Sequence, residues 1–334
     1  MQRQSVAKKA GKIFLYTLSA VMGAFSGASL LGTWLLVRSG RKRDYDCIGH
    51  VAFGKLEPIS LVASDGIRLH AWVQRSLKAT SNRWVVLLHG YRSDRTILQT
   101  RRSFFVRRGY HTLLLHFRGH GSSEAAHISY GFSERMDVKA AFDFIRSIHA
   151  GQPVEIGIDG VSMGAAAAAF AVKYESMHPD WVILESCYDN ISRALTNRLE
   201  KLVYGPFVPL IARPLQFAGK HVFHLPLKDL NPAKALEKIP CPVLVLAGDS
   251  EKVMTSAEVE QFYQSIPEPK RLVFFPGAAH DDLLVHDPRR FIKAVTDFLR
   301  EFSPSLEDNR KTSDEPAARD NRITLNDPAC PRQG

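Results

Sequence analysis

The amino-acid sequence predicts an α/β protein with a mostly parallel central sheet and helices on both faces. Short apolar runs, typical of buried strands, alternate along the chain with longer segments of helical periodicity. This alternation implies crossover connections and therefore parallel strands. The composition, 45% hydrophobic and 23% charged, is that of a globular protein. It excludes collagen-like, coiled-coil and fully disordered chains.

The net charge of +10 at pH 7 raises the question of a nucleic-acid-binding surface, but its distribution argues against one. The first 43 residues contain 8 Lys and Arg residues and no Asp or Glu. Residues 303–334 carry a net charge of −1, which leaves only +3 on residues 44–302. Because most of the basicity belongs to a short N-terminal segment, we expect no nucleic-acid partner.

An uncharged apolar segment, residues 13–37, lies between two groups of basic residues. A helix of about 20 apolar residues spans the hydrocarbon core of a bilayer, so this segment is long enough to cross with some tilt. Trp34 lies near one end, where tryptophan favours the membrane interface. The small residues at 26–28 leave a cleaved signal peptide open, but the apolar run continues beyond them and favours a retained transmembrane helix.

The orientation of this segment is not fixed by its flanking charges, because 4 Lys or Arg residues precede it and 4 follow it. Short N-terminal tails usually stay in the cytoplasm, so we expect a single-pass membrane protein whose body is extracytoplasmic. The cysteines show neither C-x-x-C spacing nor a metal-binding pattern, and they permit a disulfide without implying one. They are Cys47, Cys187, Cys241 and Cys330.

The body of the chain begins with two predicted strands, Ile59–Val62 and Leu69–Gln74, which flank a hairpin turn that contains Gly66. The further strands are expected at Trp84–Leu88, His111–Phe117, Val154–Ile158, Trp181–Leu184, Val243–Leu246 and Leu272–Phe275. The helices between and after them are expected near residues 94–108, 133–148, 163–174, 256–265 and 288–302.

Two segments interrupt the alternation. Residues 188–235 contain Pro206, Pro209, Pro214 and Pro226 and no predicted strand, and an insertion of that length usually forms a cap or lid over a site. Its net charge of +4 is typical of a solvated surface, although it could also attract anionic lipid. Residues 303–334 are polar and predicted to be disordered. The predicted organisation is a basic tail (1–12), a transmembrane helix (13–37), a connector (38–57), a body (58–302, with the cap at about 188–235) and a disordered tail (303–334).

The most specific motif is G-x-S-x-G at residues 160–164, with Ser162 at its centre. It follows a predicted strand and precedes a run of small residues, Ala165–Ala169, which is a credible helix start. In this strand–turn–helix context the serine occupies a strained turn that exposes its hydroxyl at the carboxyl end of the strand. Ser162 is therefore the candidate nucleophile.

A nucleophilic serine needs a base, and the base needs an acid that orients it. Where a serine is presented on such a turn, its partners follow in the order acid, then histidine. His280 follows the last predicted strand and would stand at the carboxyl edge of the sheet. Asp249 and Glu251 follow the preceding strand, and either carboxylate could orient the imidazole.

With these motifs, residues 58–302 resemble the α/β-hydrolase superfamily, in particular its membrane-anchored esterase-like and serine-peptidase-like members. The matching features are His89-Gly90 after the third strand, residues 118–122 (Arg-Gly-His-Gly-Ser) after the fourth, and the serine motif. A Gly131-x-x-Glu134-x-x-Asp137 stretch also opens the next helix as in many of these relatives. The resemblance implies an α/β-hydrolase fold with a cap.

The resemblance also favours Glu251 as the acid. Relatives usually carry Gly-x-x-Asp, then two apolar residues and a proline. In this alignment Val253 and Met254 are the apolar pair, Glu251 replaces the usual Asp, and Thr255 replaces the Pro. Asp249 remains the alternative acid.

An oxyanion hole is also implied by the resemblance, made of backbone N–H groups aimed at developing negative charge. It assigns one N–H to Met163, after the nucleophile, and the other to Tyr91, after His89-Gly90. For Arg118 and His120 we expect structural roles beside the serine turn.

We therefore expect a serine hydrolase, carboxylesterase-like or lipase-like, that cleaves an ester, thioester or lipid acyl bond through an acyl-enzyme. Its expected partners are a small-molecule or lipid ester and the membrane. No metal or organic cofactor is expected, because the sequence has no H-E-x-x-H, P-loop or Rossmann glycine motif. A peptidase related to aminopeptidases and a catalytically inactive binding module remain alternatives, because one fold supports many functions.

Overall fold

The computed structural model describes residues 23, 26–39, 50–51, 54–78, 80–251 and 253–303 of the 334-residue chain. The predicted basic tail 1–12, residues 13–22, 24 and 25 of the predicted transmembrane helix 13–37, and residues 304–334 of the predicted disordered tail lie outside these ranges. Within them, none of the helices combines the length and apolarity that a membrane crossing requires.

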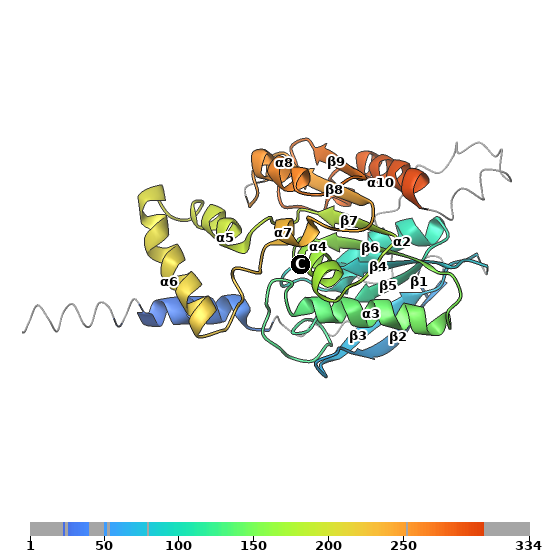
Figure 1. The fold of residues 1–334 in the computed structure, drawn as a ribbon, viewed down its shortest axis with the longest axis horizontal. Coiled ribbons are helices and arrows are strands. Elements are labelled where there is room, and N and C mark those ends of the chain that lie inside the picture. The colour runs from blue at the N-terminus through green and yellow to red at the C-terminus, as the bar shows by residue number, and fades with distance from the viewer. Residues whose placement is uncertain are drawn as a thin grey trace, which may run out of the picture.

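A nine-stranded sheet forms the centre of the described structure, in the order β1-β2-β3-β5-β4-β6-β7-β8-β9 (Figure 1). Its strands are β1 (His50–Val51), β2 (Gly54–Val62), β3 (Arg68–Gln74), β4 (Arg83–Leu88), β5 (His111–Leu115), β6 (Glu155–Val161), β7 (Trp181–Glu185), β8 (Val243–Gly248) and β9 (Lys270–Phe275). The pairings of β2 with β3 and of β3 with β5 are antiparallel, and those from β5 to β9 are all parallel. The prediction of a mostly parallel sheet is therefore confirmed.

The central strands are buried on both faces. In β4, Val85 and Leu87 belong to one apolar cluster, and Val86 and Leu88 belong to another. This division arises because successive side chains of a strand point to opposite faces of the sheet. Strands covered on both faces have continuous apolar sequences, and this is why the alternation of strands and helices could be recognised.

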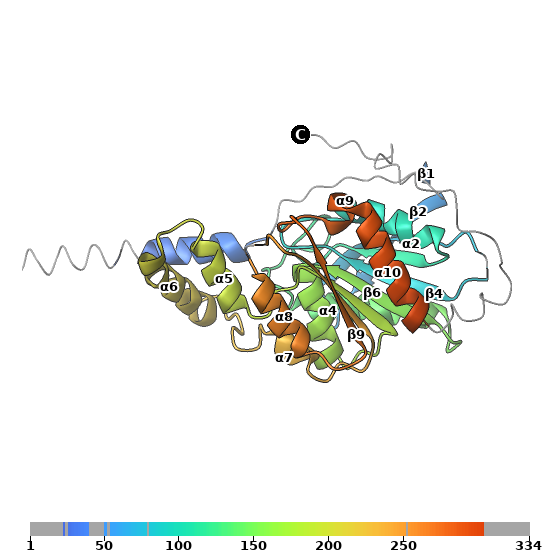
Figure 2. The ribbon, with the colours of Figure 1, turned by 90° about the horizontal axis from the view of Figure 1, so that it is seen from above.

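Helices cover both faces of this sheet (Figure 2). On one face lie α2 (Gln99–Arg107) and α10 (Pro288–Phe302), which contribute Phe105 and Phe298 to the same cluster as Val85. On the other face lie α3 (Glu134–Ile148), α4 (Met163–Tyr174) and α8 (Ser256–Gln264). The two remaining short helices of the body are η1 (Arg95–Leu98) and α9 (Leu283–His286). The predicted helices of the body correspond to these elements.

Residues 188–235 form the predicted cap region and contain no strand among the described residues. Its helices are α5 (Ile191–Leu199), η2 (Gly205–Phe207), α6 (Val208–His221) and α7 (Pro232–Leu236). Pro206 and Pro209 stand in the first turn of η2 and α6, where no intrahelical N–H is lost. Figures 1 and 2 show α5 and α6 projecting beyond the end of the sheet, whereas α7 packs against α4.

Residues 26–37 are helical and lie alongside α6 (Figures 1 and 2). Buried Thr33 donates a hydrogen bond to the Leu215 carbonyl oxygen of α6 over 3.3 Å. A Cβ atom at Gly32 would lie 3.1 Å from a Leu215 methyl group, so the two helices approach closely at this point. This segment, part of the predicted transmembrane helix, therefore packs on protein along one side.

Buried Arg101 of α2 links three carboxylates at the carboxyl end of the sheet. Its guanidinium lies 2.6 Å from the Glu185 carboxylate, 3.0 Å from that of Asp282 and 3.3 Å from that of Asp159. Burial raises the pKa of Glu185 to about 7, while the neighbouring Arg101 opposes this shift. Since these groups come from α2, β6, β7 and the β9–α9 connection, one cation holds four separate parts of the chain together.

We expect Arg101→Met to lower the free energy of unfolding by about 3–5 kcal/mol, because buried carboxylates would lose their cation. The matched control is Lys293→Met, which breaks an exposed ion pair with Asp297 in which the lysine side chain is 78% exposed. That change should cost at most about 1 kcal/mol. Urea unfolding followed by tryptophan fluorescence measures both values. Equal, small losses for the two variants would contradict this account of Arg101.

Candidate active site

The candidate nucleophile, Ser162, occupies the tight turn between β6 and α4. Its backbone lies at φ 53° and ψ −113°, an unfavourable region for a residue with a side chain. The flanking glycines are required by close packing: a Cβ atom at Gly160 would lie 2.7 Å from the Ala165 nitrogen, and one at Gly164 would lie 2.6 Å from the Leu88 oxygen. The turn places the serine at the carboxyl end of β6.

His280 and Glu251 lie next to this serine. The distance between His280 Nε2 and Ser162 Oγ is 3.0 Å, and His280 Nδ1 contacts Glu251 Oε1 on its other side. An ionised carboxylate only accepts hydrogen bonds, so Nδ1 carries the proton and Nε2 is left to accept the serine proton. The carboxylate is buried, whereas the imidazole is 32% exposed. This arrangement can activate a serine.

Asp249, the alternative acid, points elsewhere. Its carboxylate accepts a hydrogen bond from the Gly277 N–H at 2.7 Å and another from the Ser250 hydroxyl at 3.1 Å. Asp249 therefore fixes the loop that leads to His280 rather than contacting the imidazole. Of the two carboxylates that the sequence left open, the structure brings Glu251 to the histidine.

The loops that carry Glu251 and His280 meet where β8 ends. A Cβ atom at Gly248 would lie 2.2 Å from the Ala278 carbonyl oxygen, so only glycine permits this approach. Two residues later, the Ser250 N–H donates to the same oxygen at 3.0 Å. The close crossing of the two loops is what brings acid and base together across 29 residues of sequence.

The two backbone N–H groups assigned to the oxyanion hole lie near the serine. Met163 begins α4 directly after Ser162, and a Cβ atom at Gly90 would lie 3.5 Å from Ser162 Cβ, so the Tyr91 loop borders the nucleophile. Within the described part of the chain, neither the Tyr91 nor the Met163 N–H donates a backbone hydrogen bond. Both N–H groups therefore remain candidates for the oxyanion hole.

Two buried histidines accept hydrogen bonds from backbone N–H groups around the Tyr91 loop. His120 Nε2 accepts the Arg92 N–H at 3.1 Å, and His89 Nε2 accepts the Phe117 N–H at 3.3 Å. Burial lowers the pKa of both imidazoles, which keeps them neutral and able to accept these bonds. Their role is structural, as we expected for His120.

Arg118 also makes structural contacts, with the carboxylates of Asp65 and Asp137. In the same region, buried Glu134 accepts hydrogen bonds from the N–H groups of Ser129 and Gly131, each at 2.9 Å. These contacts shape the loops between β5 and α3. They give a physical role to the two motifs that the sequence placed beside the serine turn.

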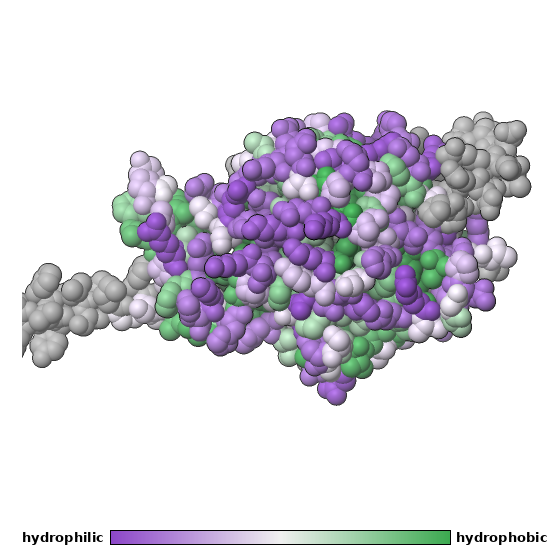
Figure 3. All heavy atoms as spheres, in the orientation of Figure 1, coloured by the Kyte–Doolittle hydropathy of each residue, from purple (hydrophilic) through white to green (hydrophobic). Residues whose placement is uncertain are grey.

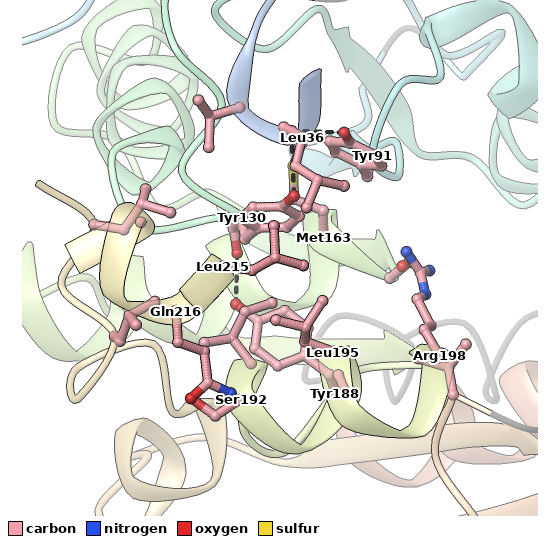
Figure 4. Close-up of a pocket in the computed structure, with 18 of the residues that line it drawn as sticks. Leu36, Tyr91, Tyr130, Met163, Tyr188, Ser192, Leu195, Arg198, Leu215 and Gln216 are labelled. Carbon is pink, nitrogen blue, oxygen red and sulfur yellow. Dashed lines mark hydrogen bonds between the residues drawn. The ribbon is translucent and has the colours of Figure 1, made fainter. Parts of the chain in front are cut away.

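An apolar cavity of about 110 Å³ extends from Ser162 between the body, the cap and the helical segment 26–37 (Figure 4). The sequence reasoning did not assign its walls, because they carry no catalytic motif. Their only signal in the sequence was the apolar character of residues 13–37 and of the cap. The residues that line the cavity include Thr33, Leu36, Val37, Tyr130, Tyr188, Leu195, Arg198, Leu215, Leu225, Leu227 and Val253.

Two tyrosines attach the helical segment to the site. The hydroxyl groups of Tyr91 and Tyr130 both donate to the Leu36 carbonyl oxygen, at 2.6 and 3.2 Å, and their rings stack 5.2 Å apart (Figure 4). The Tyr188 hydroxyl in turn donates to the Tyr130 carbonyl oxygen at 2.6 Å. The end of the helical segment is thereby bonded to Tyr91, the residue that follows Gly90 beside the nucleophile.

Comparison with protein families gives a match of residues 79–234 to the family described as serine aminopeptidase, S33. Protein Rv2307c of Mycobacterium tuberculosis is 27% identical over 239 residues, which cover 71% of this chain and 76% of that protein. The α/β hydrolase domain-containing protein WAV2 of Arabidopsis thaliana is 24% identical over 257 residues, which cover 74% and 80% of the two chains.

Solved structures are similar in fold. The esterase Pf2001 of Pyrococcus furiosus superposes with a TM-score of 0.60 at 21% identity, covering 79% of this chain and 95% of that one. The esterase EaEST of Exiguobacterium antarcticum gives a TM-score of 0.54 at 16% identity, covering 73% and 100%. At these identities the likeness concerns the fold.

We expect Glu251→Gln to lower kcat for p-nitrophenyl acetate by about 10⁴-fold, because an amide can hold the imidazole in the wrong tautomer. Asp249→Asn, which affects only the supporting loop, should lower kcat by about tenfold at most. Steady-state kinetics of the two purified variants measures the difference. A larger loss for Asp249→Asn would assign the acid to Asp249 instead.

Proposed function

We propose that this chain, an α/β-hydrolase by its fold, is a serine hydrolase that cleaves a carboxylic ester, thioester or lipid acyl bond. The observation that carries the proposal is the alignment of Ser162 Oγ, His280 and Glu251, with 3.0 Å between Oγ and Nε2, at the end of an apolar cavity. The similarity of the fold to structures of esterases supports the same chemistry.

The proposed reaction uses these groups in two steps. Ser162 Oγ attacks the acyl carbonyl carbon while His280 Nε2 takes its proton, and Glu251 stabilises the imidazolium that forms. The N–H groups of Tyr91 and Met163 donate to the negative oxygen of the tetrahedral intermediate. The intermediate then expels the alcohol or thiol, which takes the proton from His280. Water attacks the acyl-enzyme by the same route and restores the serine.

The lining of the cavity favours an acyl chain as the bound group. Among the described residues that form it, Arg198 is the one Lys, Arg, Asp or Glu. A cavity of about 110 Å³ is well above the roughly 10–15 Å³ that a single water needs, so it has room for several methylene groups of an acyl chain. Burying such a chain against leucine, valine and tyrosine side chains is favourable because apolar surface leaves water.

A peptidase is the second candidate, because the matching family is described as serine aminopeptidase. An enzyme that recognises a free amino terminus needs a negative or strongly accepting group to pair with the ammonium ion. In the described lining no carboxylate faces the cavity, and its charged side chain, Arg198, would repel an ammonium ion. This difference favours an acyl ester over a peptide.

We further propose that the apolar segment 13–37 holds the protein at a membrane, with the body on the extracytoplasmic side. The support is its lack of charge over 25 residues and its basic flanks. Accessibility of a C-terminal tag to protease in intact cells and in permeabilised cells tests the orientation. Digestion in permeabilised cells alone would contradict the proposed sidedness.

The catalytic proposal is tested with a fluorophosphonate probe and a substrate panel. We expect the wild-type chain to be labelled and Ser162→Ala to be unlabelled, since the probe reacts with an activated serine hydroxyl. Among p-nitrophenyl esters and aminoacyl p-nitroanilides, we expect hydrolysis of esters, with the highest kcat/KM at medium chain length. Failure of the wild-type chain to react with the probe would leave the binding-module alternative, and preferential cleavage of the anilides would favour the peptidase.

A further inference from the structure

Exposed hydrophobic side chains gather at one end of the molecule. Of the sixteen large hydrophobic side chains that are exposed in the described structure, ten lie on the helical segment 26–37 or between residues 202 and 222 of the cap. Figure 3 shows hydrophobic surface at this end. We name these ten residues the apolar face: Leu30, Leu31, Trp34, Leu35, Leu202, Tyr204, Phe207, Leu210, Phe217 and Val222. Exposed patches of this kind mark interaction sites.

The segment 26–37 and α6 carry six of the ten residues of the apolar face, and each of these helices has an opposite side buried against the protein. On the N-terminal segment, Thr33 and Val37 are buried, while Leu30 and Trp34, four residues apart, point outward. On α6, Ala212 and Ala218 are buried, whereas Leu210 and Phe217 are exposed, Phe217 at 64%. The exposed hydrophobic residues are therefore an outer surface of two packed helices, not part of the core.

The charged residues in the two segments that carry the apolar face are all basic. Residues 26–39 and 201–222 contain Arg38, Lys201, Arg213 and Lys220, all exposed, and no Asp or Glu. Arg213 lies three residues after Leu210 and Lys220 three residues after Phe217, so basic and apolar side chains share the outer side of α6. Leucine, tryptophan and phenylalanine combined with Lys and Arg are typical of helices that lie in a membrane interface.

We propose that the apolar face docks on a bilayer that contains anionic lipids, and that acyl chains pass from this bilayer directly into the cavity. The basic side chains match anionic headgroups, and Trp34 and Tyr204 are suited to the headgroup level. Exposed lysines argue against a second copy of the chain as the occupant, because lysine is depleted in protein–protein interfaces.

The cavity lies between the same two helices. Thr33 and Leu36 line it from the segment that carries Trp34 on its outside, and Leu215 and Gly219 line it from α6, which carries Phe217 on its outside. An acyl chain that leaves the bilayer between these helices would reach Ser162 without crossing water. This second part rests on the proposed function, whereas docking on the bilayer does not.

The docking is tested by tryptophan quenching on the full chain. In a Trp34→Phe background the remaining tryptophans, Trp72, Trp84 and Trp181, are at most 1% exposed, so a new surface tryptophan is a clean reporter. Phe217→Trp places the reporter on the apolar face. Ile148→Trp is the matched control, because Ile148 is 40% exposed at the end of α3, before the amino end of β6. The probe is vesicles of phosphatidylcholine and phosphatidylglycerol with brominated acyl chains.

We expect strong quenching of the tryptophan at position 217 and none at position 148, also when Ser162→Ala is added. The double charge reversal Arg213→Glu, Lys220→Glu should weaken binding of the vesicles by about twenty-fold or more, since each base near an anionic surface contributes about fivefold. In reconstituted protein, the quenching at position 217 should weaken by the same factor. The charge control is Lys78→Glu with Lys238→Glu, on exposed loops that precede β4 and β8. Equal quenching at positions 217 and 148, or an equal effect of the two charge reversals, would overturn docking through this face.

Transfer of the acyl chain is tested with Leu210→Glu, which changes the apolar face but no cavity residue. Hydrolysis of a long-chain ester embedded in vesicles should fall at least tenfold, while hydrolysis of soluble p-nitrophenyl acetate stays unchanged. Equal retention of both activities would overturn direct transfer.

Because quenching requires no catalysis, an inactive but quenched protein would contradict the proposed function alone, and an active, unquenched protein would contradict docking alone. Dimerisation with shielding of position 217 in vesicle-free solution, together with no quenching in vesicles, would show that a second copy covers the face.

Discussion

The turn at Ser162 is the constraint on which the rest of the site depends. Its backbone conformation, φ 53°, costs of the order of 1–3 kcal/mol and persists only because its surroundings fix it. Gly160 and Gly164 allow β6, α4 and the end of β4 to approach within contact distance. The alanines at 165–169 are fully buried, so small side chains let α4 lie close to the sheet beneath the serine. The same small residues therefore permit both the close packing of α4 on the sheet and the position of Ser162.

Buried charge completes this edge of the sheet. Arg101 joins Asp159 and Glu185 of two adjacent strands to Asp282, which follows His280 by two residues. A buried cation with several carboxylates is costly to desolvate and tolerates little displacement, because each partner would be left unpaired. The cluster therefore fixes the chain that carries the histidine relative to the strands that carry the serine turn. The relative position of Ser162 and His280 therefore depends on a charged cluster that does not line the cavity.

The cavity, in contrast, is assembled from parts of the chain that are far apart in sequence. The Leu36 carbonyl oxygen accepts from two tyrosine hydroxyls, and one of them belongs to Tyr91, which follows Gly90 beside the nucleophile. The helical segment 26–37 is thus both a wall of the cavity and a neighbour of α6. Because the Tyr91 hydroxyl is bonded to Leu36, movement of this segment would displace the Tyr91 side chain beside Ser162. A membrane that shifts the segment would therefore act on the surroundings of Ser162 through the contact between Leu36 and Tyr91.

Sequence and tertiary structure decided different parts of this protein. Local patterns predicted the parallel sheet, the serine turn and the strand-free insertion at 188–235, because periodicity and glycine motifs act over a few residues. The order of acid and histidine followed from the serine motif. Local patterns left Asp249 and Glu251 open, since both follow the same strand and only the crossing of two loops at Gly248 directs one carboxylate to the imidazole. They also gave no sign that residues 26–37, part of the predicted transmembrane helix, form a wall of the cavity. Which side of that helix meets Leu215, Tyr91 and Tyr130 was decided by packing between residues 182, 55 and 94 positions apart, and no local pattern records such contacts.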